Sequence, residues 1–409
     1  MQKYGGSSLA SVEQVRHVAG VVAGTVASGH TVVVVVSARG DTTDELLRLA
    51  EIVSPVRPAR ELDQLLATGE TAAAALLAMA LAARDVPATS LTAAQAGIRA
   101  GGQHGSGLIA RIDTTRIRHL LDEGRVVVVS GFQAVDEHGD VVTLGRGGSD
   151  TTAVAVAAEL GAGRCEVYTD VDGIYTADPR IVPGSRRLPT VVSAVMTEMA
   201  FGGAKVMHSR AVELASLSGV DIEVRSSATA EPGTVVLIAP AESLDNRGAV
   251  VAITHDRAVA RILLRADTDV APQVFETLGR CGVAVDLVAR SGSGEPEFRM
   301  GFTVHRDQLA RLLEPLRSAV GAAGGQVEVN AEVGKVSLIG TGLLNRPEIV
   351  ARMLAALGRA GIATSWVSAT QLRTSVTVPL PMVGAAVTVL HDEFGLDHDN
   401  FDLATAVAS

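Results

Sequence analysis

The chain has 409 residues, of which 47% are hydrophobic and 20% charged, so it can bury a sizeable core and is predicted to be folded. Its formal net charge of −10 and its 3% of aromatic residues exclude a generally basic protein that binds nucleic acid through stacked aromatic side chains. The composition does not exclude a protein that binds a small phosphate ligand in a local basic pocket.

Cys165 and Cys281 are the only two cysteines, which are too few for a four-thiolate zinc site or a disulfide framework. A reduced, cytoplasmic setting is therefore the simplest interpretation. The sequence shows no uncharged apolar run of 18 residues and no signal peptide, so we expect no membrane span. At about one domain per ~150 residues, the length predicts two or three domains.

The first half of the chain alternates strand-like and helix-like segments. This alternation predicts a mostly parallel sheet with helices on both faces. Ligands of such sheets bind beyond the carboxyl ends of the strands, so the loops that follow the strands are the candidate site. The predicted strands are 31–36, 126–129, 166–169 and 222–225, and the clearest helices are 70–84 and 151–160.

The first candidate motif is Lys3-Tyr4-Gly5-Gly6-Ser7-Ser8, ahead of a helical pattern that starts at Val12. Glycines let a backbone approach a phosphate, a helix N-terminus offers free N–H groups, and Lys3 adds a positive charge. Taken alone, the segment is better explained as a glycine turn with an exposed lysine.

A second motif, Ser37 to Asp44, directly follows the strand at 31–36. Hydroxyl groups at the end of a buried parallel strand can orient a carboxylate or an ammonium group. Capping of the next helix by Asp41, Thr42 or Thr43 explains the same residues equally well.

A third motif, Thr143 to Thr152, enters the helix at 151–160 and fits neither the dinucleotide fingerprint nor the P-loop spacing. It places glycines, Arg146, Ser149 and Asp150 at one helix start. The helix dipole explains Asp150 but leaves Arg146 and its glycines unexplained.

A long polar loop from Thr169 to Arg180 leaves the strand at 166–169, and a glycine pair at 202–203 precedes Lys205. Calcium binding by the aspartates of this loop is disfavoured, because the spacing lacks the glutamate that ends a calcium-binding loop.

The second half of the chain repeats itself after a turn-rich stretch near 228–248. The segment 278–284 recurs as 357–363, and each copy ends a helix-like stretch and enters a strand-like one. The repeat predicts two small α+β modules, with chance similarity of two helix ends as the alternative.

Four of these segments, taken in order and followed by paired modules, resemble the aspartate kinases of the amino-acid kinase family. They are Lys3 to Ser8, Gly145 to Asp150, Thr169 to Arg180 and Gly203 to His208. The resemblance covers nearly the whole chain. Kinases of the same fold that act on acetylglutamate, glutamate or UMP do not usually combine this start with paired ACT modules.

The resemblance implies an α/β fold: a carbamate kinase-like three-layer αβα sandwich with a mostly parallel sheet, then two ferredoxin-like βαββαβ ACT domains. We expect the catalytic domain at 1–240. The first ACT domain is expected at 249–330, with the C-terminal segment as the candidate to complete it, and the second at 331–403. ACT modules commonly pair, so we expect a homodimer or higher homo-oligomer through them.

The resemblance also implies transfer of the ATP γ-phosphate to the β-carboxylate of L-aspartate. The products are 4-phospho-L-aspartate and ADP, in the first step of the route to lysine, threonine and methionine. Lys3 matches the family lysine that contacts the transferred phosphate, and Asp150 is expected to orient it. Arg146 matches the arginine that pairs with the substrate α-carboxylate, and Glu70 matches the glutamate that binds its ammonium group.

The remaining positions that the resemblance implies line the substrate and nucleotide sites. Ser37, Thr43 and Ser149 join the amino-acid site. Mg²⁺ is expected to arrive on ATP with water ligands, because no protein side chains are assigned to it. The nucleotide-binding set is Lys3, Gly5, Gly6, Ser7, Thr169, Asp170, Tyr175, Arg180 and Lys205.

The chain departs from the family pattern in two places. Only Met1 and Gln2 precede Lys3, so we expect a short first strand or a natural upstream extension. The ACT modules lack the usual proline-glycine turns, and Gln371 stands where the family has a glutamate. With lysine or threonine as effectors, these changes predict weakened feedback inhibition; the candidate effector residues are Asp267, Asp269, Asn345 and Gln371.

Two alternatives remain at this point. One is a kinase of the same fold that acts on another amino-acid carboxylate. The other is a catalytically silent ACT-domain sensor of amino acids, against which the retention of Lys3, Glu70, Arg146 and Asp150 argues.

Overall fold

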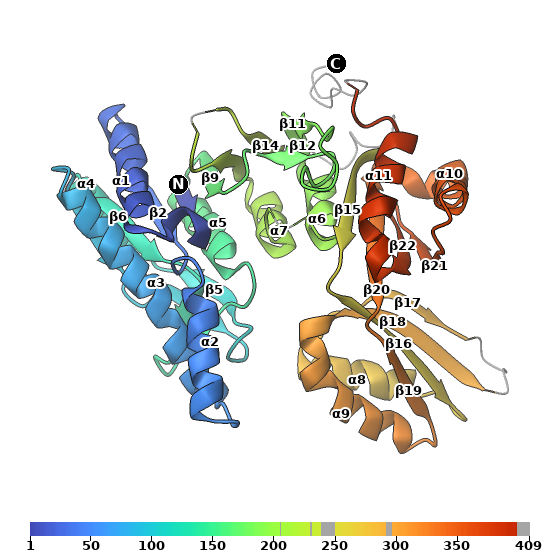
Figure 1. Cartoon of the computed structure of the whole chain (residues 1–409). Coiled ribbons are helices and arrows are strands. Elements are labelled where there is room, and N and C mark those ends of the chain that lie inside the picture. Colours follow the sequence, from blue (N-terminus) through green and yellow to red (C-terminus); the bar gives the residue numbers. More distant parts are fainter. Residues whose placement is uncertain (205, 230, 239–249, 292–296, 399–409) are drawn as a thin grey trace. The chain divides into compact units, whose positions relative to one another are not determined.

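The computed structural model describes residues 1–204, 206–229, 231–238, 250–291 and 297–398 (Figure 1). The chain divides into two compact units. The first comprises Met1–Ile174, Arg187–Ala200 and Lys205–Pro240, and the second comprises Tyr175–Arg186, Phe201–Ala204 and Ala241–Ser409.

The first unit is built on an eight-stranded sheet in the order β12-β14-β13-β9-β1-β2-β6-β3. Neighbouring strands pair in parallel, except for the antiparallel pair of β13 and β14. The strands are β1 (Gln2–Tyr4), β2 (Val33–Val36), β3 (Ala88–Leu91), β6 (Val126–Ser130), β9 (Arg164–Thr169), β12 (Thr190–Val192), β13 (Asp221–Ser226) and β14 (Thr234–Leu237).

Helices cover both faces of this sheet, which explains why β2 and β6 are buried along their whole length. On one face α1 and α3 bury a cluster with Tyr4, Val34 and Val128, and on the other α5 contacts β1, β2 and β9. The helices are α1 (Val12–Ala27), α2 (Thr42–Val53), α3 (Ala59–Ala82), α4 (Thr115–Asp122), α5 (Gly148–Leu160), α6 (Ser193–Phe201) and α7 (Ser209–Ser218). The predicted three-layer αβα sandwich is thus confirmed.

A second, smaller sheet of the first unit leads the chain into α5. Its strands run in the order β5-β4-β7-β8, and β8 (Val141–Thr143) is followed by the turn that starts α5. The other three strands are β4 (Ile98–Gly101), β5 (Leu108–Ile112) and β7 (Gln133–Val135).

By length and composition alone, α3 is apolar enough to cross a membrane, with a mean hydropathy of 1.7 in its most apolar stretch. Of that stretch, 44% is buried inside the structure, and core helices of soluble proteins pass the same test. Leu77 and Leu81 of α3 are fully buried against α1 and the sheet. We therefore read α3 as a core helix.

The second unit contains two modules that share the order strand, helix, strand, strand, helix, as the sequence repeat predicted. The first module forms the sheet β17-β18-β16-β19, and the second forms β15-β20-β22-β21. The first contains β16 (Val259–Ala266), α8 (Ala271–Cys281), β17 (Asp286–Arg290), β18 (Phe298–His305), α9 (Leu309–Gly321) and β19 (Gln326–Asn330). The second contains β20 (Val333–Gly340), α10 (Pro347–Arg359), β21 (Ser365–Ala369), β22 (Arg373–Pro379) and α11 (Val383–Glu393).

The strand β15 (Val250–Asp256) lies in the range 249–330, which was expected to form the first module, but it pairs antiparallel with β20 of the second. The first module is already complete, because β19 occupies that edge of β16. The described part of the second module has no strand after α11, so β15 fills the free edge of β20. We propose 259–330 as the first module, with β15 completing the second.

Asp286 of β17 joins the two modules through a buried ion cluster. Its carboxylate accepts hydrogen bonds from Lys335 Nζ at 2.9 Å and from the two terminal nitrogens of Arg373 at 2.8 and 3.0 Å. Although burial alone would raise the pKa of Asp286, these two cations hold it well below its ordinary value. The modules are therefore joined by charged hydrogen bonds.

Candidate functional site

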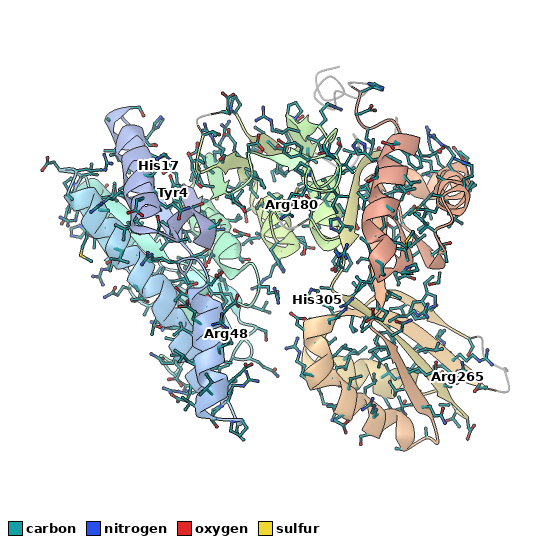
Figure 2. The ribbon with its side chains drawn as sticks, viewed as in Figure 1. Tyr4, His17, Arg48, Arg180, Arg265 and His305 are labelled. Atoms are coloured by element: carbon teal, nitrogen blue, oxygen red, sulfur yellow. The ribbon has the colours of Figure 1, made fainter. Side chains whose placement is uncertain are left out.

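Lys3 and Asp150 form a buried ion pair at the centre of the sheet. Side chains alternate along β1, so Tyr4 faces α1 and α3 (Figure 2) while Lys3 faces α5. Lys3 Nζ lies 2.7 Å from Asp150 Oδ1, in the first turn of α5. Only 9% of Lys3 and 8% of Asp150 is exposed, so the pair interacts in a low-dielectric setting.

The start of α5 depends on two glycines with left-handed backbone angles. Gly145 has φ of 74° and Gly147 has φ of 70°. A Cβ atom on Gly147 would lie 2.1 Å from the Cβ of His208, so no side chain fits there. This tight turn sets Ser149 and Asp150 at the helix N-terminus, where the dipole stabilises a negative charge.

The loop after β1 packs directly on the loop after β2. A Cβ atom on Gly6 would lie 2.7 Å from the carbonyl oxygen of Ala38, and Gly40 N donates to Gly6 O at 2.9 Å. Gly5 lies beside Lys3: a Cβ atom on Gly5 would lie 3.6 Å from Lys3 Nζ. The glycines of the first motif thus allow a close backbone approach beside a cation.

Glu70 presents a buried carboxylate next to these loops. One oxygen accepts a hydrogen bond from Ala38 N at 3.0 Å, and only 3% of the residue is exposed. The other oxygen has no hydrogen-bond partner among the described residues. Burial raises the pKa of Glu70 to about 7. A buried, unsatisfied carboxylate oxygen favours a bound cation or donor.

Backbone hydrogen bonds bring the loops that follow four strands to one edge of the sheet. Ser37 N donates to Tyr4 O at 3.1 Å, Gly5 N to Tyr168 O at 3.1 Å, and Ser227 N to Thr169 O at 2.9 Å. Thr169 Oγ1 also donates to Asp170 at 3.0 Å. The predicted Ser37, Thr169 and Asp170 therefore share this edge with Lys3.

Further predicted residues lie in the turn before α5, in α2 and in the second unit. Arg146 is exposed on the turn between β8 and α5, and Thr43 lies half-buried in the first turn of α2. Tyr175 and Arg180 belong to the second unit, where Arg180 binds both oxygens of Asp178 at 3.0 and 2.8 Å. Lys205 lies outside the described residues.

The effector candidates fall in the two modules of the second unit. In the second module, Leu343 N donates to Gln371 O at 2.9 Å, which places the loops of Asn345 and Gln371 side by side. In the first module, Asp267 and Asp269 are exposed, and Asp269 pairs with Arg290 at 3.1 Å.

Sequence reasoning missed two charged residues beside the site, Asp63 and Arg210. Asp63 accepts hydrogen bonds from Gly105 and Thr143, and Arg210 donates to Leu144 and Gly107. A signal existed for Asp63, because it stands seven residues before Glu70 and therefore on the same face of the helix. Nothing in the local sequence distinguishes Arg210 from a surface arginine.

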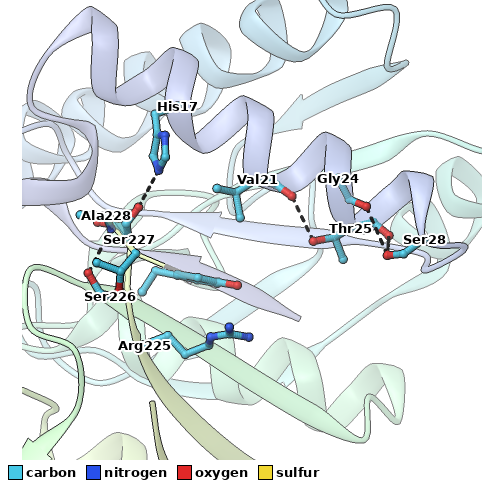
Figure 3. A pocket seen from close by; sticks show the side chains of 11 residues that line it. His17, Val21, Gly24, Thr25, Ser28, Arg225, Ser226, Ser227 and Ala228 are labelled. Atoms are coloured by element: carbon cyan, nitrogen blue, oxygen red, sulfur yellow. Dashed lines mark hydrogen bonds between the residues drawn. The ribbon is translucent and has the colours of Figure 1, made fainter. Parts of the chain in front are cut away.

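A cavity of about 380 Å³ lies between α1 and the sheet, and none of the predicted site residues lines it (Figure 3). Its walls include His17, Thr25, Tyr168 and Arg225. The Arg225 guanidinium is already paired with Glu166 at 3.4 Å, which makes the cavity a poor phosphate site. Tyr168 stacks on Tyr4 at 4.6 Å between ring centres, so the cavity is on the sheet face opposite Lys3.

Two family models match the chain. The model described as the amino acid kinase family matches residues 2–226, and one described as an ACT domain matches residues 336–394. The aspartokinase of Mycolicibacterium smegmatis is 45% identical over an alignment of 408 residues that covers 98% of this chain and 97% of that protein.

Two solved structures share the fold. Aspartokinase III of E. coli in complex with aspartate and ADP has a TM-score of 0.80 at 24% identity, covering 96% of this chain and 99% of that one. The same enzyme in complex with lysine and aspartate has a TM-score of 0.69 at 23% identity, covering 96% and 98%. These likenesses describe the fold alone.

Proposed function

Because the chain belongs to the amino acid kinase family and is an aspartate kinase within it, we propose that Lys3 and Asp150 form its catalytic centre. The observation that carries this assignment is the buried pair at 2.7 Å, beside the close-packed glycines at the carboxyl edge of the sheet. Parallel sheets of this kind bind ligands at that edge.

In the reaction, an oxygen of the aspartate β-carboxylate attacks the γ-phosphorus of ATP. A new P–O bond forms, the bond from the γ-phosphorus to the β,γ-bridging oxygen breaks, and ADP leaves with that electron pair. The nucleophile is already ionised at neutral pH, so no proton has to be removed. The energetic difficulty is bringing an anion up to a polyanion, which positioning and positive charge overcome.

Lys3 supplies that positive charge in our assignment. Its ammonium group is held by Asp150 within a low-dielectric environment, so it needs little reorganisation as charge shifts in the transition state. Asp150 orients Lys3, and the N-terminus of α5 stabilises the Asp150 carboxylate. Asp150 itself is not required as a base.

We assign the aspartate site to the loops after β2 and before α5. Glu70 offers its unsatisfied oxygen to the substrate ammonium group, and Arg146 offers a planar guanidinium fork to the α-carboxylate. Ser37, Thr43 and Ser149 complete the site with hydroxyl groups. Glu70 would then distinguish an amino acid from a plain dicarboxylate.

The nucleotide site is assigned to the residues around the carboxyl ends of β1 and β9. The backbone after Gly5 starts a short 3-10 helix, Gly6–Leu9, where glycines allow phosphate oxygens to approach the backbone. Ser7, Thr169 and Asp170 belong to the same assignment. Tyr175, Arg180 and Lys205 remain proposed members of the set from the family resemblance.

Mg²⁺ is the metal that such a phosphate transfer uses, and we propose that it enters with ATP. Among the described residues, no three of the His, Cys, Asp and Glu side chains cluster closely enough to hold a metal ion. The ion would therefore bind phosphate oxygens and water, as Mg²⁺ commonly does. Bound there, it would neutralise charge on the phosphates.

Aspartate is the expected substrate in an assay that couples ADP release to a spectroscopic signal. With Mg-ATP, we expect turnover with L-aspartate, and rates at least about 100-fold lower with L-glutamate or N-acetyl-L-glutamate, because a longer or acylated substrate misplaces the reacting carboxylate.

Two results of this assay would change the assignment. Equal rates with glutamate would favour a broader kinase of the same fold. No ADP release with any of the three acids, from folded protein, would instead support an ACT-domain sensor. Succinate serves as the matched control, because it lacks the ammonium group that Glu70 is proposed to bind.

Lysine and threonine are the proposed effectors, and the ACT domains are the proposed place where they bind. The neutral Gln371 offers no charge to an effector ammonium group, so we expect feedback inhibition to be weak. Titrating aspartate kinase activity with lysine, threonine and both together tests this. Strong inhibition below millimolar concentrations would show that the ACT modules retain full feedback control.

Our proposal for the cellular context follows from the substrates. The reaction consumes ATP and free aspartate, which places it in the cytoplasm at the first step of the route to lysine, threonine and methionine. The strands β17, β19 and β21 stand at sheet edges, and we propose a homodimer or higher homo-oligomer through the ACT modules.

A further inference from the structure

A buried carboxylate, that of Asp63, hydrogen-bonds to the backbone next to the turn that carries Arg146. Asp63 of α3 accepts hydrogen bonds from Thr143 N at 2.8 Å, Thr143 Oγ1 at 2.7 Å and Gly105 N at 2.9 Å. His104 Nδ1 lies 3.2 Å from the same carboxylate. Only 2% of Asp63 is exposed, so these charge-assisted hydrogen bonds are shielded from water.

A guanidinium group, that of Arg210, donates hydrogen bonds to the same part of the backbone. Arg210 of α7 donates to Leu144 O at 3.0 Å and to Gly107 O at 2.9 Å. In the part of the chain that the structure describes, Arg210 makes no ion pair, and burial lowers the pKa of its side chain. Its donors are thus directed at backbone carbonyl groups rather than at an acidic side chain.

These two residues hold one small arch of backbone. Gly107 N donates to Thr143 O at 2.9 Å, which joins the segment 105–107 to the end of β8. Asp63 accepts hydrogen bonds from N–H groups of this arch, and Arg210 donates to its carbonyl groups. The two ends of the peptide dipoles are therefore held by charges of opposite sign.

The arch leads directly into the glycine turn that carries Arg146, so the hydrogen bonds of Asp63 and Arg210 also affect the proposed substrate ligand. Glycines at 145 and 147 have wide backbone freedom in the unfolded chain, which makes the turn costly to order. Arg146 stands between these two glycines, so the position of its Cα, from which the guanidinium reaches out, follows the backbone of the turn.

We propose that Asp63 and Arg210 are positioning residues that fix the turn 144–147 and so set the affinity for the substrate α-carboxylate through Arg146. The inference rests on the proposed function, since it takes Arg146 as the carboxylate ligand. Neither residue needs to touch the substrate.

The test is a double-mutant cycle with steady-state kinetics. Arg210→Met keeps an unbranched apolar stem but removes both donors, and we expect it to raise KM for aspartate about tenfold, while KM for ATP changes less than about twofold. Asp63→Asn should act in the same direction, and Arg210→Lys should restore part of the loss. In an Arg146→Ala background, Arg210→Met should add less than about a further twofold.

The matched control is Arg118→Met, because Arg118 also donates to a backbone carbonyl, that of Glu159 at 2.9 Å, but at the far end of α5. It should leave both KM values unchanged. Hydrogen exchange should quicken in segment 141–147 of the Arg210 and Asp63 variants only. Asp63→Asn and Arg210→Lys provide the test if Arg210→Met does not fold.

The outcomes distinguish the positioning role of Asp63 and Arg210 from the assignment of Arg146 as the carboxylate ligand. If Arg146→Ala raises KM for aspartate but Arg210→Met and Asp63→Asn do not, Arg146 keeps its role and the positioning role is overturned. Equal effects of Arg210→Met in both backgrounds would overturn it too, because the residue would then not act through Arg146. If Arg146→Ala leaves KM for aspartate unchanged, the assignment of Arg146 fails and this inference fails with it.

Discussion

Replacing Lys3 by alanine is expected to lower kcat of the aspartate kinase reaction by about 10³-fold, because a preorganised charge at the transferred phosphate is lost. Asp150→Ala should have an effect of similar size, since Lys3 would lose the partner that holds it 2.7 Å away. The measurement is the ADP-coupled assay at saturating aspartate and Mg-ATP.

The double variant gives the sharper result. If Asp150 acts by orienting Lys3, Lys3→Ala/Asp150→Ala should be only slightly slower than either single variant, because both remove the same interaction. Multiplicative losses would instead mean that Asp150 has a separate catalytic role. Unaltered kcat in Lys3→Ala would remove the catalytic assignment altogether.

Stability needs its own control in this series. Each single variant leaves one buried charge without its partner, whereas the double variant removes both. We therefore expect the melting temperatures of the single variants to fall below that of the double variant. Circular dichroism of all three should show a retained fold, so that the loss of activity is not a loss of structure.

Aspartate binding is expected to weaken as the pH falls below about 7, because burial raises the pKa of Glu70 to about that value. The proposed ligand of the ammonium group is the ionised carboxylate, which becomes protonated in this range. In the wild-type protein, kcat/KM for aspartate should fall between pH 8 and pH 6. In Glu70→Gln it should be about 10- to 100-fold lower at pH 8 and lack this step.

The same group predicts an opposite trend in stability. The folded protein holds the Glu70 proton more tightly than the unfolded chain does, because the pKa rises from 4.5 to about 7 on folding. This contribution to stability is complete below about pH 4.5 and is lost as the pH rises through about 7. Glu70→Gln should therefore melt a few degrees above wild type at pH 8 and close to it at pH 5.

Glu61→Gln is the control for both measurements, because Glu61 lies on the same helix α3 but is exposed. It should change neither the pH profile nor the difference in melting temperature. An identical pH profile in wild type and Glu70→Gln would contradict the role of Glu70.

Local sequence was enough to predict the strands that form continuous apolar runs, and the motif loops, because those signals are local. The valine runs of β2 and β6 are buried on both faces, as continuous β-branched runs predict, and the strands occupy 33–36 and 126–130. The pairing of Lys3 with Asp150, which the family resemblance implied, is present at 2.7 Å. The first strand has three residues.

The strand β15 could not be assigned from its sequence. A strand that stands just before the first module can pair with either sheet, and only the free edge of β20 decides the choice. Local propensity does not say which edge is free.

The sequence by itself determined the chemistry available to this protein: a lysine and glycines after the first strand, and an arginine and an aspartate at the start of a later helix. Only the tertiary structure decided which charges are buried, which oxygen of Glu70 is left without a partner, and which residues hold the turn of Arg146. Burial and hydrogen bonding depend on segments far apart in the chain, such as Asp63, Thr143 and Arg210. A local sequence pattern gives residue types but not these long-range contacts.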